Sequence, residues 1–316
     1  LEVLISISRF WKQRVNFSEP KQKYVMLGVT GPNEYENNVN NNWYTNVIAA
    51  WTMEYTMYAI DKVKREDPDR YEEITNKLHF NDITETNAWR DIVENMYFPY
   101  DEGQKIYLQQ EGYLDKTQRT VEDLSVSERP INQVWSWDRI LRSCFIKQAD
   151  VIQGLYFFED RCDKETIRRN YDFYEPKTVH ESSLSPCVHS ILAAKLGYQE
   201  KAYNLYLRTA RLDLDDYNHE VAEGCHVTSM AGTYMSIVEG FGGMRIHEGQ
   251  LHFNPFIPEK WEMFSFIVKF RERQLKIEVT KKDVTIYNQE GNAIELFLFD
   301  EKHEVAPDSH IKSTYK

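Results

Sequence analysis

One stretch of the chain combines a carboxylate with amide and aromatic side chains. Residues 28–46 read GVTGPNEYENNVNNNWYTN, with Glu34 directly after a turn-forming TGPN and Glu36 two positions later. Amides can bind sugar hydroxyls, aromatic rings can stack on sugar rings, and a carboxylic acid can protonate a glycosidic oxygen. A capped loop with solvated asparagines would have the same composition, so the residue types alone leave both interpretations open.

A polar pair, Lys147 and Gln148, interrupts an apolar pattern. Between Trp137 and Leu155 apolar residues recur at helical spacing, which predicts one helix that is buried along most of its length. Because burying an unpaired ammonium is costly, Lys147 must either extend to solvent or meet polar groups.

Two further loops are rich in hydrogen-bond donors and precede helices. Residues 180–185 read HESSLS before a helix that ends at Leu196, with Gly197 as its C-terminal glycine. Residues 224–229 read GCHVTS before a helical run over 230–238. Hydroxyls and free backbone N–H groups at a helix N-terminus bind anions, although such serines also serve as simple helix caps. We call these two segments the hydroxyl loops.

The histidines do not indicate a metal site. His219 and His226 are seven residues apart, His180 and His189 are nine apart, and neither HExxH nor GxxxxGK[ST] occurs. We therefore expect no metal and no cofactor.

The elements that position these loops change type near residue 250. Up to Gly249 the apolar spacing is helical, as in Glu85–Met96, and Asp67-Pro68 marks a helix start. Beyond it, alternating apolar runs predict antiparallel strands over 264–270, 275–280, 284–287 and 294–299. Helices joined by long polar loops and followed by a β module suggest an α/α toroid or part of one.

Composition narrows the class of protein. The 316 residues are 41% hydrophobic and 14% aromatic, enough for about two domains with packed cores. A net charge of −12 argues against nucleic acid and anionic membranes as partners, and no apolar run is long enough to span a bilayer. Four cysteines without a CxxC pair predict reduced core thiols of a cytoplasmic protein. The start at Leu1, without Met and inside an apolar pattern, predicts the later part of a longer protein.

The segment 28–46 resembles the signature of the disaccharide phosphorylases of glycoside hydrolase family 65, most of all those that act on maltose. The resemblance continues through WSWDRILRSCFIKQADVIQGLYFFED, YDFYEPKTVHESSLSP and DLDDYNHEVAEGCHVTSMAGTYMSIVEGFGGMR, so it covers almost the whole chain in order. It implies a mainly α fold, with the second half of an (α/α)6 barrel over residues 1–249. A small antiparallel β domain would follow over 250–316.

The same resemblance implies inverting phosphorolysis of an α-linked glucose disaccharide, with maltose and phosphate giving β-glucose 1-phosphate and glucose. Glu34 would be the acid, and Lys147 and Gln148 would bind glucose hydroxyls. Phosphate is an anion and needs no general base, so hydrogen-bond donors should surround it. The resemblance assigns this role to Ser182, Ser183, His226, Thr228 and Ser229.

Several alternatives remain open at this level. Glu36 rivals Glu34 as the acid, and an inverting, trehalase-like hydrolase on the same barrel would need Glu181 or Glu223 as a second carboxylate. Trehalose, kojibiose and nigerose are alternative substrates. The chain by itself could also be an inactive fragment that is structural or binds sugar. The full-length protein is expected to be a homodimer.

Overall fold

The structure, a computed structural model, describes residues 1–315, which form two compact units; the first ends at Val179 and the second begins at His180. Each unit is described by itself. In the described residues, no helix has the length and apolar character to cross a membrane.

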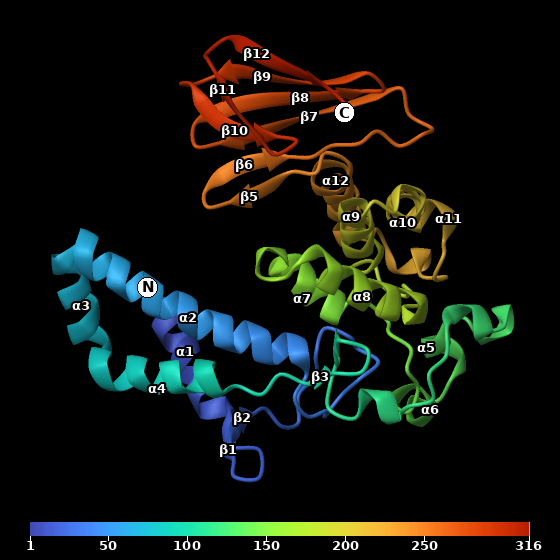
Figure 1. The fold of residues 1–316 in the computed structure, drawn as a ribbon. Coiled ribbons are helices and arrows are strands. Elements are labelled where there is room, and N and C mark those ends of the chain that lie inside the picture. Colours follow the sequence, from blue (N-terminus) through green and yellow to red (C-terminus); the bar gives the residue numbers. More distant parts are fainter. Residues whose placement is uncertain (316) are drawn as a thin grey trace. The chain divides into compact units, whose positions relative to one another are not determined.

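The first unit begins with four helices: α1 (Glu2–Arg14), α2 (Trp43–Glu66), α3 (Pro68–Leu78) and α4 (Asp82–Asn95). Figure 1 shows α2 running alongside α1 and α4. The core between them contains Met53 of α2 and Trp89 of α4, both fully buried. The predicted helix start is confirmed, since the Asp67 carboxylate accepts from Arg70 N–H and Pro68 is the first helical residue.

Shorter elements complete the first unit. Its helices are α5 (Ile131–Val134), α6 (Trp137–Leu141), α7 (Val151–Phe157) and α8 (Lys164–Tyr174). Single 3₁₀ turns lie at Tyr113–Asp115, Val121–Asp123, Val126–Glu128, Glu159–Arg161 and Glu175–Lys177. Two small hairpins pair β1 (Asn16–Ser18) with β2 (Lys23–Val25) and β3 (Tyr100–Asp101) with β4 (Ile106–Tyr107).

The prediction of one helix from Trp137 to Leu155 is wrong. α6 ends at Leu141 and α7 begins at Val151, and the chain between them is not helical. Ile146 instead forms a bridge with Thr178: its N–H donates to Lys177 O at 3.0 Å, and Val179 N–H donates to its carbonyl at 2.8 Å. The neighbouring segment therefore satisfies backbone groups that a helix would have satisfied internally, while the apolar side chains stay buried.

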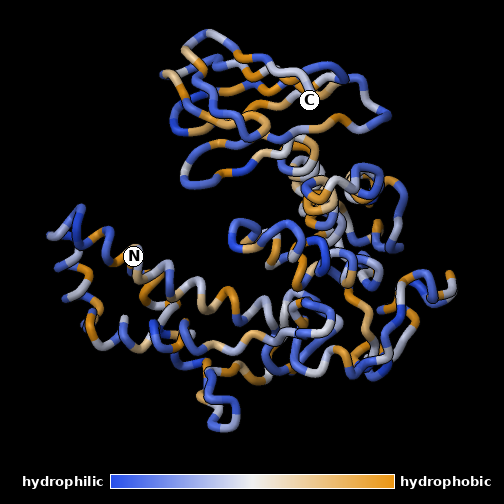
Figure 2. Tube along the Cα trace, in the orientation of Figure 1, coloured by the Kyte–Doolittle hydropathy of each residue, from blue (hydrophilic) through white to orange (hydrophobic). Residues whose placement is uncertain are grey.

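The helices of the second unit are α9 (Pro186–Leu196), α10 (Gln199–Ala210), α11 (Leu212–Asp215) and α12 (Val227–Met235). A 3₁₀ turn lies at Val221–Glu223, and a π-helical turn continues α12 over Ser236–Phe241. α9 is buried on nearly all sides, and Figure 2 colours most of it as hydrophobic. As predicted, Gly197 ends α9, with a φ of +88° that favours glycine. α12 starts three residues earlier than expected, so Thr228 and Ser229 lie in its first turn.

The chain ends in two four-stranded sheets, ordered β11-β10-β6-β5 and β12-β9-β8-β7. The strands are β5 (Arg245–His247), β6 (Gln250–Phe253), β7 (Met263–Phe270), β8 (Arg273–Thr280), β9 (Asp283–Glu290), β10 (Ile294–Leu298), β11 (Glu301–Val305) and β12 (Ser309–Thr314). The mainly α fold with a C-terminal β module is thus confirmed. Sequence analysis predicted β7, β8, β9 and β10 but missed the other four.

The strand pairing follows the apolar pattern. Leu275, Ile277 and Val279 alternate along β8 on the buried face, and the colours along the strands in Figure 2 alternate in the same way. One pair departs from the antiparallel prediction: β10 runs parallel to β6, with Leu296 opposite Leu251. The predicted division of the chain into 1–249 and 250–316 remains a prediction.

Candidate active site

Glu34 lies in the loop that precedes α2, and its side chain is exposed. The Glu34 side chain is 55% exposed, and its carboxylate forms an ion pair with the ammonium of Lys147. Lys147 belongs to the non-helical segment between α6 and α7, and its side chain is 23% exposed. The structure therefore brings together two of the predicted site residues from segments more than a hundred positions apart.

Asn33 holds both backbone segments of this pair in place. Its side chain is fully buried, and its Oδ1 accepts from Lys147 N–H at 2.9 Å and from Tyr35 N–H at 3.1 Å. Its Nδ2 donates to Gln109 Oε1 at 3.3 Å. The Asn33 amide thus holds the backbone of Lys147 and the backbone next to Glu34. Sequence analysis did not single out Asn33, although it directly precedes Glu34.

Asp150 holds the backbone of Asn33 by hydrogen bonding. Its carboxylate accepts from Asn33 N–H at 3.1 Å and from Asn42 Nδ2 at 3.0 and 3.1 Å, while Asn42 Oδ1 caps α2 by accepting from Thr45 N–H at 2.9 Å. Burial raises the pKa of Asp150 to about 7, against the opposing effect of the hydrogen bonds from Asn33 and Asn42.

Gly31 permits this close packing. A Cβ at Gly31 would lie 2.4 Å from Asn42 Nδ2 and 2.6 Å from Asp150 Oδ2, distances that real Cβ atoms do not show. The glycine of the TGPN turn is therefore required by the approach of the Asp150 network and not only by the turn itself. Sequence analysis missed Asp150, whose only signal was a charged residue inside an apolar run.

Gln148 is placed differently from its neighbour. It is 5% exposed, and among residues 1–315 its Oε1 is buried without a hydrogen-bond partner. A buried acceptor without a partner costs free energy unless a ligand or water supplies a donor. A sugar hydroxyl is such a donor, so the structure is compatible with the predicted role of Gln148.

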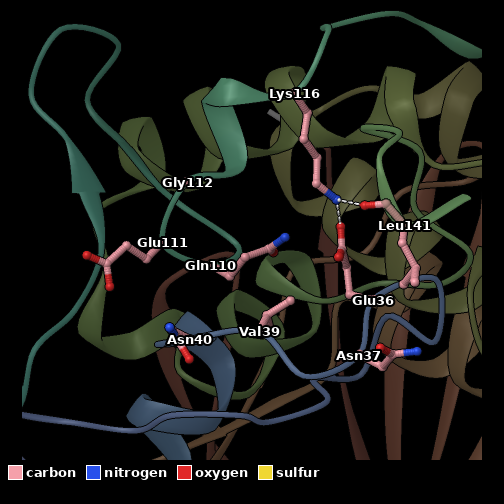
Figure 3. Close-up of a pocket in the computed structure, with 9 residues that line it drawn as sticks. All are labelled: Glu36, Asn37, Val39, Asn40, Gln110, Glu111, Gly112, Lys116 and Leu141. Atoms are coloured by element: carbon pink, nitrogen blue, oxygen red, sulfur yellow. Dashed lines mark hydrogen bonds and ion pairs between the residues drawn. The ribbon is translucent and has the colours of Figure 1, made fainter. Parts of the chain in front are cut away.

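Glu36, the rival acid, occupies a different environment. It is 4% exposed and its carboxylate pairs with the ammonium of Lys116, which also donates to Leu141 O at 2.9 Å. Figure 3 shows this pair on the wall of a cavity of about 360 Å³ that Gln110 and Glu111 also line. Both carboxylates therefore pair with a lysine, but that of Glu36 is buried whereas that of Glu34 is exposed.

The two hydroxyl loops meet in the second unit. Ser183 Oγ lies 3.3 Å from Thr228 Oγ1, and Ser182 Oγ accepts from Leu184 N–H at 3.3 Å. Ser229 differs from these residues because it is buried and its hydroxyl donates to Thr209 O at 2.7 Å. The structure therefore brings Ser183 and Thr228 together and turns Ser229 toward the packing between α12 and α10.

His226 precedes α12 and is held by a carboxylate that sequence analysis did not identify. Asp213 Oδ1 lies 2.5 Å from His226 Nδ1, and Asp213 Oδ2 accepts from His226 N–H at 3.0 Å. On the other side of the ring, Glu220 Oε2 lies 3.8 Å from Nε2. The run DLDD at 213–216 was the only sequence signal for Asp213, and nothing in its spacing marks one aspartate above the others.

The remaining candidates divide by exposure. Glu181 is buried, whereas Glu223 is exposed in its 3₁₀ turn. The four cysteines are free, as predicted, but Cys225 is exposed, so its description as a core thiol is wrong. Cys225 lies in the hydroxyl loop before α12, where little packs over the backbone.

Glu34, Lys147 and Gln148 belong to the first unit, and the five predicted phosphate-binding residues belong to the second.

Comparison with known families and proteins gives consistent matches. Residues 1–235 match the central catalytic domain of glycosyl hydrolase family 65, and residues 244–305 match its C-terminal domain. The chain is 50% identical over 303 residues to maltose phosphorylase of Bacillus subtilis (strain 168), which covers 95% of the chain and 39% of that protein. It is 39% identical over 302 residues to alpha,alpha-trehalose phosphorylase of Thermoanaerobacter brockii, again covering 95% of the chain and 39% of the relative.

A solved structure gives the same result. It is assigned as a kojibiose phosphorylase from the human microbiome and matches with a TM-score of 0.91 at 33% identity, covering 99% of this chain and 43% of that one. The chain thus spans about two fifths of the length of the relatives it matches.

Proposed function

The chain belongs to glycosyl hydrolase family 65, with part of the (α/α)6 catalytic barrel and the C-terminal β domain, and from this premise we propose that it serves an inverting disaccharide phosphorylase. In the proposed reaction, maltose and phosphate give β-glucose 1-phosphate and glucose. The observation that carries the proposal is the exposed Glu34 carboxylate, held against Lys147 by the buried Asn33 and Asp150.

Glu34 is proposed as the general acid that protonates the departing glucose oxygen. Its exposure leaves the carboxyl accessible to a substrate, whereas Glu36 is buried and paired with Lys116. Lys147 and Gln148 are proposed to bind hydroxyls of the glucose that is transferred. The buried Oε1 of Gln148 supports this assignment, because within the described part of the chain it has no hydrogen-bond donor.

Phosphate is proposed to bind at the hydroxyl loops, through Ser182, Ser183, His226 and Thr228. The contact between Ser183 and Thr228 supports a shared site, since it places hydroxyls of both loops within 3.3 Å. Ser229, the fifth predicted residue, contributes through the packing of α12, because its hydroxyl is engaged with Thr209 O.

Maltose is proposed as the disaccharide because the 50% identity to a maltose phosphorylase exceeds the 39% identity to a trehalose phosphorylase. Trehalose, kojibiose and nigerose are the competing substrates. We further propose that the protein acts in the cytoplasm as a homodimer and that the reaction needs neither metal nor organic cofactor. Light scattering of the complete polypeptide tests the dimer, and dialysis against a chelator tests the independence from metal.

The experiment that tests the function is maltose turnover by the complete natural polypeptide with and without phosphate. We expect turnover only with phosphate, and NMR recorded at once should show β-glucose 1-phosphate as the first product. Equal rates without phosphate would identify an inverting hydrolase instead, and an initial α-anomer would contradict inversion.

A further inference from the structure

We infer that Asp213 is a positioning residue for the phosphate subsite and that it acts by holding the ring of His226 with Nε2 as the nitrogen left for phosphate. This inference rests on the proposed function, because that proposal supplies phosphate as the ligand of His226.

The Asp213 carboxylate contacts His226 at two points, an arrangement that we call the clamp. Asp213 lies in the short helix α11, thirteen positions before His226, and one carboxylate oxygen contacts ring Nδ1 at 2.5 Å. The other oxygen accepts from the backbone N–H of His226 at 3.0 Å. The same carboxylate therefore fixes the ring orientation and the start of α12, whose first turn carries Thr228.

The clamp also determines which ring nitrogen carries the proton. Hydrogen bonds from the His226 side chain and backbone lower the pKa of Asp213, so Asp213 is a carboxylate at neutral pH. A carboxylate only accepts, and Nδ1 must therefore be the donor in this contact. Nε2 remains to accept the proton of a phosphate O–H, or to donate to a phosphate oxygen when the ring is cationic.

A second carboxylate faces the ring from the opposite side. Glu220 Oε2 lies 3.8 Å from Nε2, beyond hydrogen-bond distance, and its backbone N–H is held at 2.9 Å by Asp216 Oδ1. Glu220 therefore places negative charge where phosphate is expected, whereas Asp213 places it on the far side of the ring. The two carboxylates should affect phosphate in opposite directions.

This opposition gives a matched pair of variants. Asp213→Asn and Glu220→Gln each remove one negative charge next to the same imidazole. If charge alone mattered, both would lower the KM for phosphate. Positioning by Asp213 instead predicts that Asp213→Asn raises this KM about ten-fold, as the loss of one oriented, charge-assisted hydrogen bond would, while Glu220→Gln lowers it.

The control is Asp215→Asn, on the same helix. Asp215 pairs with Arg211 at 2.6 and 2.8 Å and makes no contact with His226, so its replacement should leave both KM values unchanged. In Asp213→Asn the KM for maltose and kcat at saturating phosphate should stay within a factor of about three of the parent, because sugar binding and the acid are untouched.

A readout that needs no turnover separates this inference from the proposed function. In protein labelled with ¹⁵N-histidine, with the His226 signals assigned by His226→Ala, the parent should show the Nδ1–H tautomer and Asp213→Ala should lose that preference. If the tautomer changes but the parent turns over maltose equally well without phosphate, the proposed function fails and the clamp stands.

Two results would overturn the inference itself. One is a phosphate KM that moves in the same direction for Asp213→Asn and Glu220→Gln. The other is an Asp213→Ala variant that loses only thermal stability, with the parent tautomer and phosphate KM retained. Ser183→Ala provides the reference for losing one donor of the hydroxyl loops, since it leaves the ring and its clamp intact.

Discussion

Replacing Asp150 by Asn perturbs the buried network beneath Glu34 with a small change in shape. The Asp150 carboxylate accepts from Asn33 N–H and from Asn42 Nδ2, and an amide oxygen at the Oδ2 position can accept both bonds. The substitution therefore keeps the main contacts but removes the ability to ionise. We expect it to change how the stability of the fold depends on pH.

The magnitude follows from the pKa of this group. Burial raises it to about 7 from the ordinary value of 3.8. Between these two pH values the folded state holds a proton that the unfolded state has released, so the free energy of unfolding falls as pH rises. About three pKa units at about 1.4 kcal/mol each give a loss of about 4 kcal/mol, complete above pH 7. The amide side chain of the Asp150→Asn variant carries no charge at any pH and avoids this loss.

Urea unfolding of the parent and of Asp150→Asn, followed by tryptophan fluorescence at pH 5, 6, 7 and 8, measures the effect. The difference between the two proteins cancels the titration of all other groups. Relative to the parent, the variant should gain about 2 kcal/mol of stability between pH 5 and pH 7, and almost nothing more beyond pH 8. Any lost hydrogen bond adds an offset that does not depend on pH.

Parallel curves for the two proteins would refute the reasoning, since they would mean that Asp150 ionises equally in the folded and unfolded states. A difference that grows toward low pH would refute it as well, because it would mean that the native environment favours the carboxylate. The matched control is Asp138→Asn, whose side chain is exposed and paired with Arg142. It should leave the dependence on pH almost unchanged.

Three further predictions concern the two glutamates and the thiols. Glu34→Gln should slow maltose phosphorolysis by about 10²–10⁴ but keep most activity on α-glucosyl fluoride with phosphate, whose leaving group needs no proton, and the reverse pattern in Glu36→Gln would reassign the acid. Glu36→Gln should instead destabilise the fold by about 1–3 kcal/mol, because it leaves the ammonium of Lys116, whose side chain is only 14% exposed, without its carboxylate partner. Peptide mapping after brief alkylation should find Cys225 modified before Cys187, because Cys225 is exposed and burial raises the pKa of Cys187 to about 11.

Local patterns predicted much of the fold. Helix starts and ends at Asp67 and Gly197 depend on one or two residues, so they can be read directly from the sequence. The strands β7 to β10 follow from alternation with intervening turns. The four missed strands are short or carry mixed polar patterns, so their own side chains give no clear strand signal. They are strands because neighbouring strands pair with them.

The sequence by itself determined the family, the residue types available for chemistry, and the two candidate glutamates. Spacing alone could not show that Glu34 is exposed and Glu36 buried, since both lie in one loop. Apolar spacing also predicted a helix through Lys147, but the tertiary structure has a non-helical segment there, in which the neighbouring Ile146 pairs with Thr178. Apolar spacing shows which side chains are buried, but it does not fix the backbone conformation. A non-helical segment can bury the same side chains when a neighbouring segment forms hydrogen bonds with its backbone.

Only the tertiary structure decided which polar residues support the site. Asn33, Asp150 and Asp213 were ordinary polar residues in the sequence, and their partners lie 114, 117 and 13 positions away. A buried carboxylate or amide acts through the groups that surround it, and those groups come together only when distant segments pack. The physical reason is that hydrogen bonding and desolvation depend on distances in space, which a one-dimensional pattern does not contain.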